Sequence, residues 1–385
     1  MSEARIDSLS NENNTGGPTL SGITTFSGTN YFVPPVGSTI ERPQNPQKGA
    51  LRFNTDIAKL EYFRGDTIGW TEIEASNEEL DGSTRAFAAG GHSGPNGPGY
   101  SNSIDYYTID YPSNALDFGD LGNPRGNGVG GCASRTRGFI TGGYNSGTQI
   151  EYITMATKGT NGDWDNIAQW SEGGCGMGNQ TRGFNMGGFI RPAPLAWTRP
   201  SNIDCWNTST TGTAFNFGDL NDDLNYSAAF ASTTRGFNIG GTNPAVSNAI
   251  QYVTISTTGN GQDFGDLTQG AYVPSGCSNA TRGLTFIGMS PDTSTNTNAI
   301  EYTTMATQGN AIDFGDTTVD QNSSQAASSP TRASLYSGTG GGVLKWYVVN
   351  IATQGNVVEF GDVVNAGSNY GKYGGAGFSN GHGGL

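Results

Sequence analysis

The sequence has few charged residues, and few of these are basic. Only 14% of its 385 residues are charged, and 33 Asp and Glu stand against 19 Lys and Arg, for a net charge of -14. An acidic chain is repelled by the phosphates of nucleic acid and by anionic membranes. No apolar run approaches the ~20 residues of a membrane span, and the first residues lack the layout of a signal peptide. We expect a soluble protein that binds no nucleic acid, does not insert into membranes and is not exported by that route.

Metal-ligating side chains are also scarce. The sequence has four cysteines and two histidines, contains no Cys-x-x-Cys, and places His92 and His382 in glycine-rich segments. Cys132 and Cys277 hold one position of a sequence repeat and Cys175 lies close to it, so these thiols belong to different units, too far apart for a disulfide. We therefore expect buried thiols, no zinc site and no cofactor.

Recognisable catalytic motifs are missing. The sialidase pattern Ser-x-Asp-x-Gly-x-x-Trp, the Gly-x-Ser-x-Gly of hydrolases and a phosphate-binding glycine loop do not occur. Glycoside hydrolysis needs two non-equivalent carboxylates that face one cavity. Most acids here recur with the repeat, which favours a structural role, and those that do not recur form no recognisable set: Glu172, Asp222, Asp223, Asp292 and Asp320. We expect no enzyme activity.

What the sequence does contain is a repeated Thr-Arg-Gly-Phe or a close variant. The Thr residues stand at 84, 136, 181, 234, 281 and 331, in steps of 52, 45, 53, 47 and 50. Each unit adds a glycine pair or its remnant, an alternating β-rich stretch, a turn whose Gly and Asn are expected at positive φ, and Phe-Gly-Asp, replaced by Trp164-Asp165-Asn166 in the second unit. Four short strands per fifty residues are typical of a propeller blade. Residues 77–385 are therefore predicted to form a six-bladed β-propeller.

The first unit lacks the glycine-rich strand that precedes Thr-Arg in the others. Residues 373–379, which follow the last Phe-Gly-Asp, have the composition of that strand. We expect this C-terminal strand to close the ring, which would leave no open sheet edge within it. The glycine pair and the aromatic positions resemble those of kelch repeats, although Thr-Arg and Phe-Gly-Asp are departures, so the resemblance concerns architecture only.

The first 76 residues differ from the repeats. Residues 1–48 are polar and rich in Pro and Gly, which predicts an extended attachment arm that orders only on assembly with neighbouring proteins; its 23–32 stretch has the composition of a strand. Residues 49–76 show three short alternating stretches and are predicted to form a three-stranded meander with one apolar face. Such a sheet has too small a core to stand alone, so its apolar face is expected to lie on the propeller or on another subunit.

The same segment carries a resemblance to a known class of proteins. It includes Gly-Ala-Leu-Arg-Phe-Asn-Thr-Asp at 49–56, Lys-Leu-Glu-Tyr-Phe at 59–63 and Gly-x-x-x-Gly-Trp at 65–70. Together with the leader before it, residues 16–74 resemble a module of virion structural proteins of tailed bacteriophages, particularly those of marine cyanobacteria. The resemblance implies a virion location, as a tail fibre or other appendage that forms homo-oligomers and displays its propeller for binding a host-surface glycan or protein. A head or neck decoration or assembly protein is the alternative, and a polysaccharide depolymerase is less favoured.

Two sets of residues are candidates for binding. The repeat arginines could grip an anionic ligand as a ring, but we favour a structural role in which each pairs with an acid or a backbone carbonyl in or next to its own blade; they are Arg85, Arg137, Arg182, Arg235, Arg282 and Arg332. The second set lies in loops between the second and third strands, which share a face with the crossovers and vary between units, as recognition loops do. It comprises Phe189, Arg191, Trp197, Arg199, His92, Tyr100 and Tyr144. Phe189 and Trp197 could instead pack on the blade edge or on a neighbouring subunit.

Overall fold

The computed structural model describes residues 33–56, 59–73, 84–93, 99–159, 161–190, 198–291, 295–336, 338, 344–364 and 372–385. The chain divides into two compact units, Met1–Asn77 and Glu78–Leu385. The described residues form strands and turns, and none of them belongs to a helix able to cross a membrane.

The first unit contains a four-stranded sheet rather than the expected three strands. Its order is β1 (Val36–Gly37), β2 (Leu51–Asn54), β3 (Lys59–Phe63) and β4 (Trp70–Glu72), and β1 runs parallel to β2. The extra strand comes from the segment predicted to be an extended arm. The carbonyls of Pro35 and Gly37 accept the N–H groups of Phe53 and Thr55, so this part of the leader completes the sheet.

One face of this sheet carries a buried polar network beside Phe63, which the alternating pattern did not predict. Glu61 is fully buried and accepts hydrogen bonds from Arg42, Arg52 and Asn54. The hydrogen bonds from Arg42 are the main cause that lowers the pKa of Glu61. On the other face, Leu51 remains 40% exposed. The charged network holds β1 and its following turn over β2 and β3, because a buried carboxylate requires its cationic partners.

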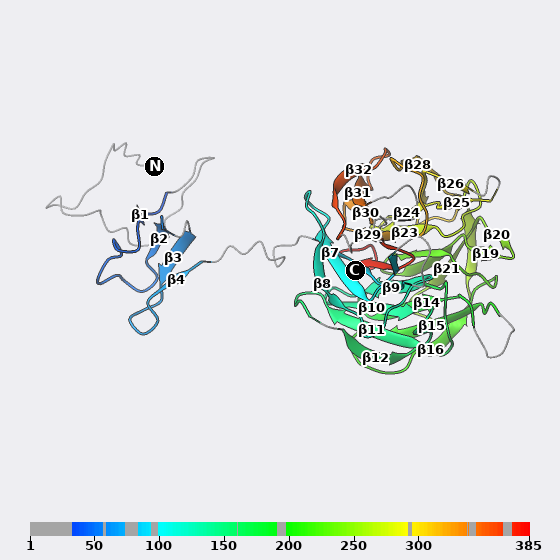
Figure 1. Cartoon of the computed structure of the whole chain (residues 1–385), viewed down its shortest axis with the longest axis horizontal. Coiled ribbons are helices and arrows are strands. Elements are labelled where there is room, and N and C mark those ends of the chain that lie inside the picture. The colour runs from blue at the N-terminus through cyan, green and yellow to red at the C-terminus, as the bar shows by residue number, and fades with distance from the viewer. Residues whose placement is uncertain are drawn as a thin grey trace, which may run out of the picture. The chain divides into compact units, whose positions relative to one another are not determined.

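The second unit contains six four-stranded antiparallel sheets in its described residues, numbered here in chain order of their Thr-Arg units. Figure 1 shows them arranged around a common centre in a propeller-like fold. Sheets 1 to 3 consist of β34 (Ala376–Ser379), β5 (Arg85–Ala89), β7 (Ser103–Thr108) and β8 (Leu116–Asp120); β9 (Val129–Ala133), β10 (Arg137–Gly142), β11 (Gln149–Thr154) and β12 (Gly162–Asn166); and β13 (Cys175–Gly178), β14 (Arg182–Met186), β15 (Asn202–Asn207) and β16 (Phe215–Asp219).

Sheets 4 to 6 follow the same plan. They consist of β17 (Ala228–Ala231), β18 (Arg235–Ile239), β21 (Ala249–Thr254) and β22 (Gln262–Asp266); β23 (Ser275–Ser278), β24 (Arg282–Phe286), β27 (Ala299–Thr304) and β28 (Ile312–Asp316); and β29 (Gln325–Ser328), β30 (Arg332–Tyr336), β31 (Lys345–Asn350) and β32 (Val358–Asp362). Three short ribbons join β6 (His92–Ser93) to β33 (Lys372–Tyr373), β19 (Thr242–Asn243) to β20 (Ala245–Val246), and β25 (Met289–Ser290) to β26 (Thr295–Asn296).

The first strands of the sheets pack against one another around the centre. The strand β34 contacts β9, and contacts continue through β13, β17, β23 and β29 back to β34. Glycine is needed where these strands approach closely: a Cβ on Gly131 would lie 2.9 Å from the carbonyl oxygen of Gly377, and one on Gly176 would lie 2.6 Å from the nitrogen of Gly131. The strand that the first unit lacks in sequence order is supplied by β34, which pairs antiparallel with β5.

The two repeated aromatic positions pack against each other in sheets 1 to 4. In sheet 3 the ring of Phe184, from Thr-Arg-Gly-Phe, meets the edge of Phe217, from Phe-Gly-Asp, with centroids 5.0 Å apart. Trp164 replaces the second ring in sheet 2 and makes the same edge contact with Phe139, also at 5.0 Å. The Trp therefore keeps the packing of the motif it replaces, since edge-to-face contact suits either aromatic ring.

The turn between the third and fourth strands joins neighbouring sheets. The side-chain oxygen of Asn310 accepts the N–H of Asp266 in the preceding sheet, at 3.1 Å, and the N–H of Gly309 is donated to the carbonyl of Phe264 at 3.0 Å. Asn310 is not among the residues with positive φ, so the expected backbone role of this Asn is wrong. Its side chain instead links Phe-Gly-Asp of one sheet to the turn of the next.

Candidate binding site at one end of the central cavity

The first strands enclose a narrow central cavity with two hollows. Hollows of about 90 Å³ and about 50 Å³ share six small lining residues, Gly131, Gly176, Ala229, Gly276, Ala326 and Gly377. The larger hollow lies where the first strands begin, and we call this the aromatic end. The smaller lies where they finish and the Thr-Arg segments start, and we call this the arginine end.

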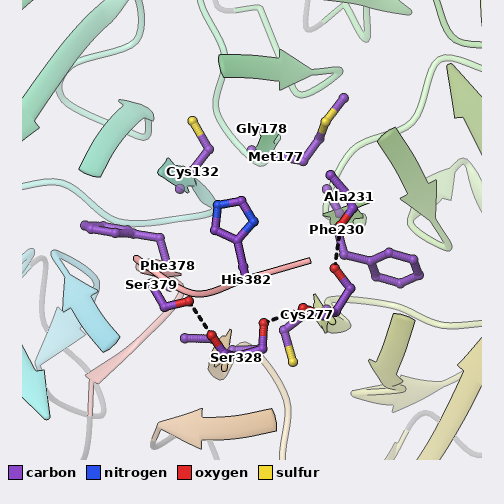
Figure 2. Close-up of a pocket in the computed structure, with 18 residues that line it drawn as sticks. Cys132, Met177, Gly178, Phe230, Ala231, Cys277, Ser328, Phe378, Ser379 and His382 are labelled. Carbon is purple, nitrogen blue, oxygen red and sulfur yellow. Dashed lines mark hydrogen bonds between the residues drawn. The ribbon is translucent and has the colours of Figure 1, made fainter. Parts of the chain in front are cut away.

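Residues 380–385 occupy the arginine end. His382 Nε2 lies 2.8 Å from the carbonyl oxygen of Ala133, and the N–H of Gly384 is donated to His382 Nδ1 at 3.1 Å. Figure 2 shows the imidazole among the ends of the first strands, and the N–H of Gly383 reaches the carbonyl of Ser278 across the cavity. Burial lowers the pKa of His382 to about 4. Its two partners require a neutral imidazole with the proton on Nε2, because a carbonyl only accepts.

The six repeat arginines join each sheet to the next one at this end. Each guanidinium donates to one or two carbonyls just after the third strand of the following sheet. The acceptors are Met155 for Arg85, Thr208 and Ser209 for Arg137, Ile255 for Arg182, Met305 and Ala306 for Arg235, Ile351 and Ala352 for Arg282, and Ile109 and Asp110 for Arg332. Five of the six also lie over an aromatic ring, as Arg282 does over Tyr302 at 4.9 Å from the centroid. The sixth arginine, Arg182, belongs to sheet 3. There Cys205 occupies the third-strand position that Tyr302 occupies in sheet 5.

A repeated backbone conformation shapes the aromatic end. The residue two places before each first strand has a left-handed φ, between 52° and 74°, at Asn127, Gly173, Tyr226, Val273, Ser323 and Gly374. Several of these residues bond to one another in sequence around the hollow: the N–H of Tyr226 is donated to Gly173, that of Ser323 to Val273, and that of Gly374 to Ser323. Asn, Gly and Ser tolerate or are common in such turns, whereas a left-handed Tyr or Val is strained.

Seven half-buried aromatic side chains gather at this end in two chains of ring contacts. In the first, Tyr373 stacks on His92 at 4.8 Å, His92 meets Tyr100 at 4.6 Å, and Tyr100 stacks on Tyr144 at 4.9 Å. In the second, Phe189 and Tyr272 each make an edge-to-face contact with Tyr226, with centroids 5.6 and 5.8 Å apart. These rings come from the β6, β10–β11 and β14–β15 loops and from the segments that lead into the first strands.

Asn127 connects the two chains of rings. Its side-chain oxygen accepts a hydrogen bond from His92 Nε2 at 2.6 Å, and its amide nitrogen donates to the Tyr100 hydroxyl and to Glu172 Oε1, at 3.3 and 3.1 Å. The backbone of Glu172 pairs with that of Phe189 in turn. The orientation of His92 is therefore fixed by a stacking ring and by a polar bond at once.

Gln325 is one of the residues around the larger hollow and is 1% exposed. Both of its amide atoms are buried and have no hydrogen-bond partner. The adjacent Ser324 hydroxyl, which also lines the hollow, has no partner either. An unpaired buried amide costs about 1–3 kcal/mol, so a site that retains one requires an explanation.

The buried acids of this end belong to joints between sheets. The third residue of the third strand is polar and buried in five sheets, as Asp105, Glu151, Asp204, Gln251 and Glu301. Most of them accept N–H groups from the loop that follows the fourth strand of the preceding sheet; Glu151 accepts that of Gly122 at 3.0 Å and also pairs with Arg125. Burial raises the pKa of Asp204 to about 6. The carboxylates are thus separated by whole sheets and do not form a pair across one cavity.

Asp105 makes the joint between sheets 6 and 1. Its Oδ2 atom lies 2.6 Å from Lys372 Nζ and accepts a hydrogen bond from the Tyr336 hydroxyl at 2.7 Å. Asp105 and Lys372 are both buried. Lys372 belongs to the segment that leads into β34, so this ion pair anchors the strand that completes sheet 1.

Five of the predicted ligand-binding residues lie at the aromatic end. His92, Tyr100 and Tyr144 contact one another in the first chain of rings, and Arg199 lies over Phe189 at 5.0 Å and donates from Nε to Asn225 at 3.2 Å. Arg191 and Trp197 lie outside the described residues, so their predicted roles have no structural test.

Sequence reasoning missed Asn127, Tyr226, Tyr272, Tyr373 and Gln325. They lie in the crossovers or at the start of a first strand, where the units have different residues. The one signal was the left-handed position, which is an Asn or a Gly in three of the six units when these are aligned on their first strands. Aligning the units there would have marked Tyr226 and Val273 as unusual.

No protein-family model matches the sequence, and no curated protein matches it. The bacteriophage and kelch resemblances therefore stay predictions. Within the described ranges, no three His, Cys, Asp or Glu residues are placed to hold a metal ion, and the four cysteines are buried and free.

Proposed function

We propose that the chain is a structural protein of a tailed-bacteriophage virion, a tail fibre or similar appendage that binds the host surface. Its six sheets are the blades of a closed kelch-like propeller, and β34 supplies the inner strand of the first blade. Residues 1–48 anchor it to other virion proteins, and it functions as a homo-oligomer. The virion location rests on the sequence of residues 16–74 alone.

The observation that carries the binding role is the gathering of seven half-buried aromatic rings at one end of the cavity. Aromatic and arginine side chains are enriched at binding hot spots, and loops on a rigid scaffold are where recognition is usually built. The buried acids Glu151 and Glu301 accept hydrogen bonds from the preceding sheets, which supports binding over depolymerase chemistry.

Adsorption of the labelled full-length protein to host cells tests this role. Binding should be saturable, and replacing Trp197 and Arg199 with Ala should weaken it while leaving the melting temperature nearly unchanged. Reducing ends released from host polysaccharide would make the protein a depolymerase. If the protein neither adsorbs to host cells nor releases reducing ends, a decoration role is favoured instead.

The anchor is tested by deletion within the arm. Removing residues 1–32 leaves β1 and Arg42 in place and so spares the network around Glu61. Such a protein should fold, and it should not be incorporated into virions. Incorporation at normal copy number would show that the arm is not the anchor.

A further inference from the structure

We propose that the sheet of the first unit carries a docking site for an acidic segment of another protein. A pocket beside Lys48 and Arg64 holds an apolar side chain of that segment, and the two cations bind a carboxylate next to it. This inference rests on the proposed attachment to other virion proteins, and it names a surface and a contact chemistry for that attachment.

The pocket lies at the end of the sheet where β2 begins and β3 finishes. It has a volume of about 260 Å³ and is lined by Lys48, Gly49, Tyr62, Phe63, Arg64 and Ile68. The N–H of Gly49 is donated to the carbonyl of Phe63 at 2.8 Å, which continues the pairing of β2 with β3. Since a cavity of about 150 Å³ holds benzene, this pocket has room for a branched aliphatic or an aromatic side chain.

The two cations of the pocket are exposed and unpaired. Among the described residues, neither Lys48 nor Arg64 makes a side-chain hydrogen bond or an ion pair. A Cβ on Gly65 would lie 3.9 Å from Lys48 Cδ, so the Lys48 side chain passes the residue next to Arg64. The other three cations of the described sheet and its turns each pair with an acid: Arg42 and Arg52 with Glu61, and Lys59 with Glu72.

The apolar part of the lining combines a fixed residue with accessible ones. The buried ring of Phe63 packs on Trp70, with centroids 5.6 Å apart, so this part of the pocket is held in place. Ile68 is 57% exposed, and Tyr62 is half-buried. An incoming apolar side chain can therefore contact Ile68 and Tyr62 without displacing the packed core of the sheet.

The pocket continues through Tyr62 into the open face of the sheet. The side chains of β1, β2 and β3 that share this face are uncharged, and they are Val36, Leu51, Phe53, Leu60 and Tyr62. Val36, Leu51 and Leu60 are 58, 40 and 36% exposed. A contiguous exposed apolar patch marks an interaction site, and this one extends over three strands. Its extent favours a protein segment over a small molecule as the occupant.

The charge of the pocket decides the character of that segment. An arginine binds a carboxylate with two parallel hydrogen bonds, and a lysine adds a second positive charge beside it. Asp66 lies in the same turn as Arg64 but is exposed and pairs with neither cation. A nucleic-acid backbone would satisfy the two cations and leave the apolar face uncovered, whereas an acidic protein segment with apolar side chains covers both.

An NMR titration of the full-length protein with N-acetylphenylalanine tests the pocket. The matched ligand is N-acetylphenylalanine amide, which has the same ring without the carboxylate and should bind about fivefold more weakly. Arg64→Gln and Lys48→Gln should each weaken binding of the acid about threefold or more. Lys59→Gln is the control, because Lys59 is a cation of the same sheet that pairs with Glu72.

Three results would overturn the pocket: no binding of the acid, equal binding of the acid and the amide, or equal binding by the three glutamine variants. A measurement that needs no substitution gives a second test. Raising the salt concentration from about 0.05 to about 0.5 M should weaken binding of the acid and leave that of the amide unchanged. An acid whose binding is independent of salt is not held by the cations.

Incorporation into virions separates this docking site from the arm. The double variant Lys48→Glu/Arg64→Glu reverses the charge of the pocket and should be incorporated poorly. If it enters virions at normal copy number while removal of residues 1–32 prevents entry, the arm is the anchor and the docking site is wrong. If both altered proteins enter normally, the proposed attachment through the first unit is itself wrong.

Discussion

The two ends of the central cavity share one repeated backbone but differ in how regularly their side chains repeat. At the arginine end, the same contact recurs six times, from a guanidinium to the carbonyls that follow the third strand of the next sheet. At the aromatic end, one left-handed backbone position recurs, but its six residues are of five types. Side chains are therefore constant at the arginine end, where they join the sheets, and vary at the aromatic end, where we propose that the molecule binds its partner. The predictions below test this division.

The largest effect is expected at the buried Asp105–Lys372 pair, which joins sheets 6 and 1. Lys372→Met leaves a buried carboxylate without its cation and should lower the free energy of unfolding by about 3–5 kcal/mol. Urea denaturation measures the change. Lys345→Met is the control, because its amine pairs with Glu359 and Asp362 at the surface and should matter little. Equal losses in the two variants would contradict the prediction.

His382 is the unrepeated residue of the arginine end, and it should make stability depend on pH. Its folded pKa of about 4 lies below its ordinary 6.5, so the folded state disfavours the proton. The contribution of neutral His382 to the free energy of unfolding is complete above about pH 6.5. It falls by about 2–3 kcal/mol as the pH is lowered toward 4. Urea midpoints at pH 7.5 and 4.5 should show a smaller drop in His382→Gln than in the unaltered protein. An identical fall in the urea midpoint of the two proteins would mean that protonation of His382 does not destabilise the folded state.

Removing one of the six equivalent arginines should cost less than breaking the buried Asp105–Lys372 pair. Arg282→Ala loses two hydrogen bonds to carbonyls and the contact with Tyr302, and should destabilise the protein by about 2 kcal/mol. Thermal and urea unfolding measure this. Arg199→Ala is the contrast at the aromatic end and should leave unfolding almost unchanged. If Arg199→Ala proves the more destabilising, the division between the two ends is wrong.

The smallest expected effect is a gain in stability. Val273 holds a φ of 53°, which costs a β-branched residue more than it costs glycine. Val273→Gly should raise the free energy of unfolding by about 0.5–1 kcal/mol, since relief of the turn exceeds the added freedom of the unfolded chain. Ala228→Gly, placed in β17 itself, should lower it. A loss of stability in Val273→Gly would show that the valine side chain packs well enough to outweigh the strain.

The strands were predictable because the repeat provides several copies of the same pattern. Unit boundaries, the pairing partner of residues 376–379 and the aromatic role of Trp164 follow from aligning those copies. The fourth strand of the first unit was not predictable, since β1 is two residues long and pairs through backbone atoms of a Pro-rich segment. Its polar core was missed because alternation alone does not say which face is buried, and here Arg42 reaches Glu61 from outside the meander.

The site could be predicted only in part. The loops of His92, Tyr100, Tyr144 and Phe189 were found by their variation between units, but their neighbours depend on contacts between distant segments. The rings of His92 and Tyr373 stack on each other although nearly the whole repeat array separates them in the sequence. Gln325 looked like any polar residue at the start of a strand, because a missing hydrogen bond is a property of packing and has no sequence pattern.

The pairing of β34 with β5 also has a consequence for the timing of synthesis. The backbone N–H of Arg85 is donated to the side-chain oxygen of Asn380 beside these paired strands. The two residues are 295 positions apart in the sequence. At about 5–20 residues per second, a ribosome needs about 15–60 seconds to make the intervening chain. During that interval β5 has no partner on its inner side, and an unpaired strand edge is prone to pair with another chain. A nascent polypeptide of this kind should therefore depend on chaperones longest at its earliest-made sheet, and a product truncated before residue 376 should be the most aggregation-prone form of the protein.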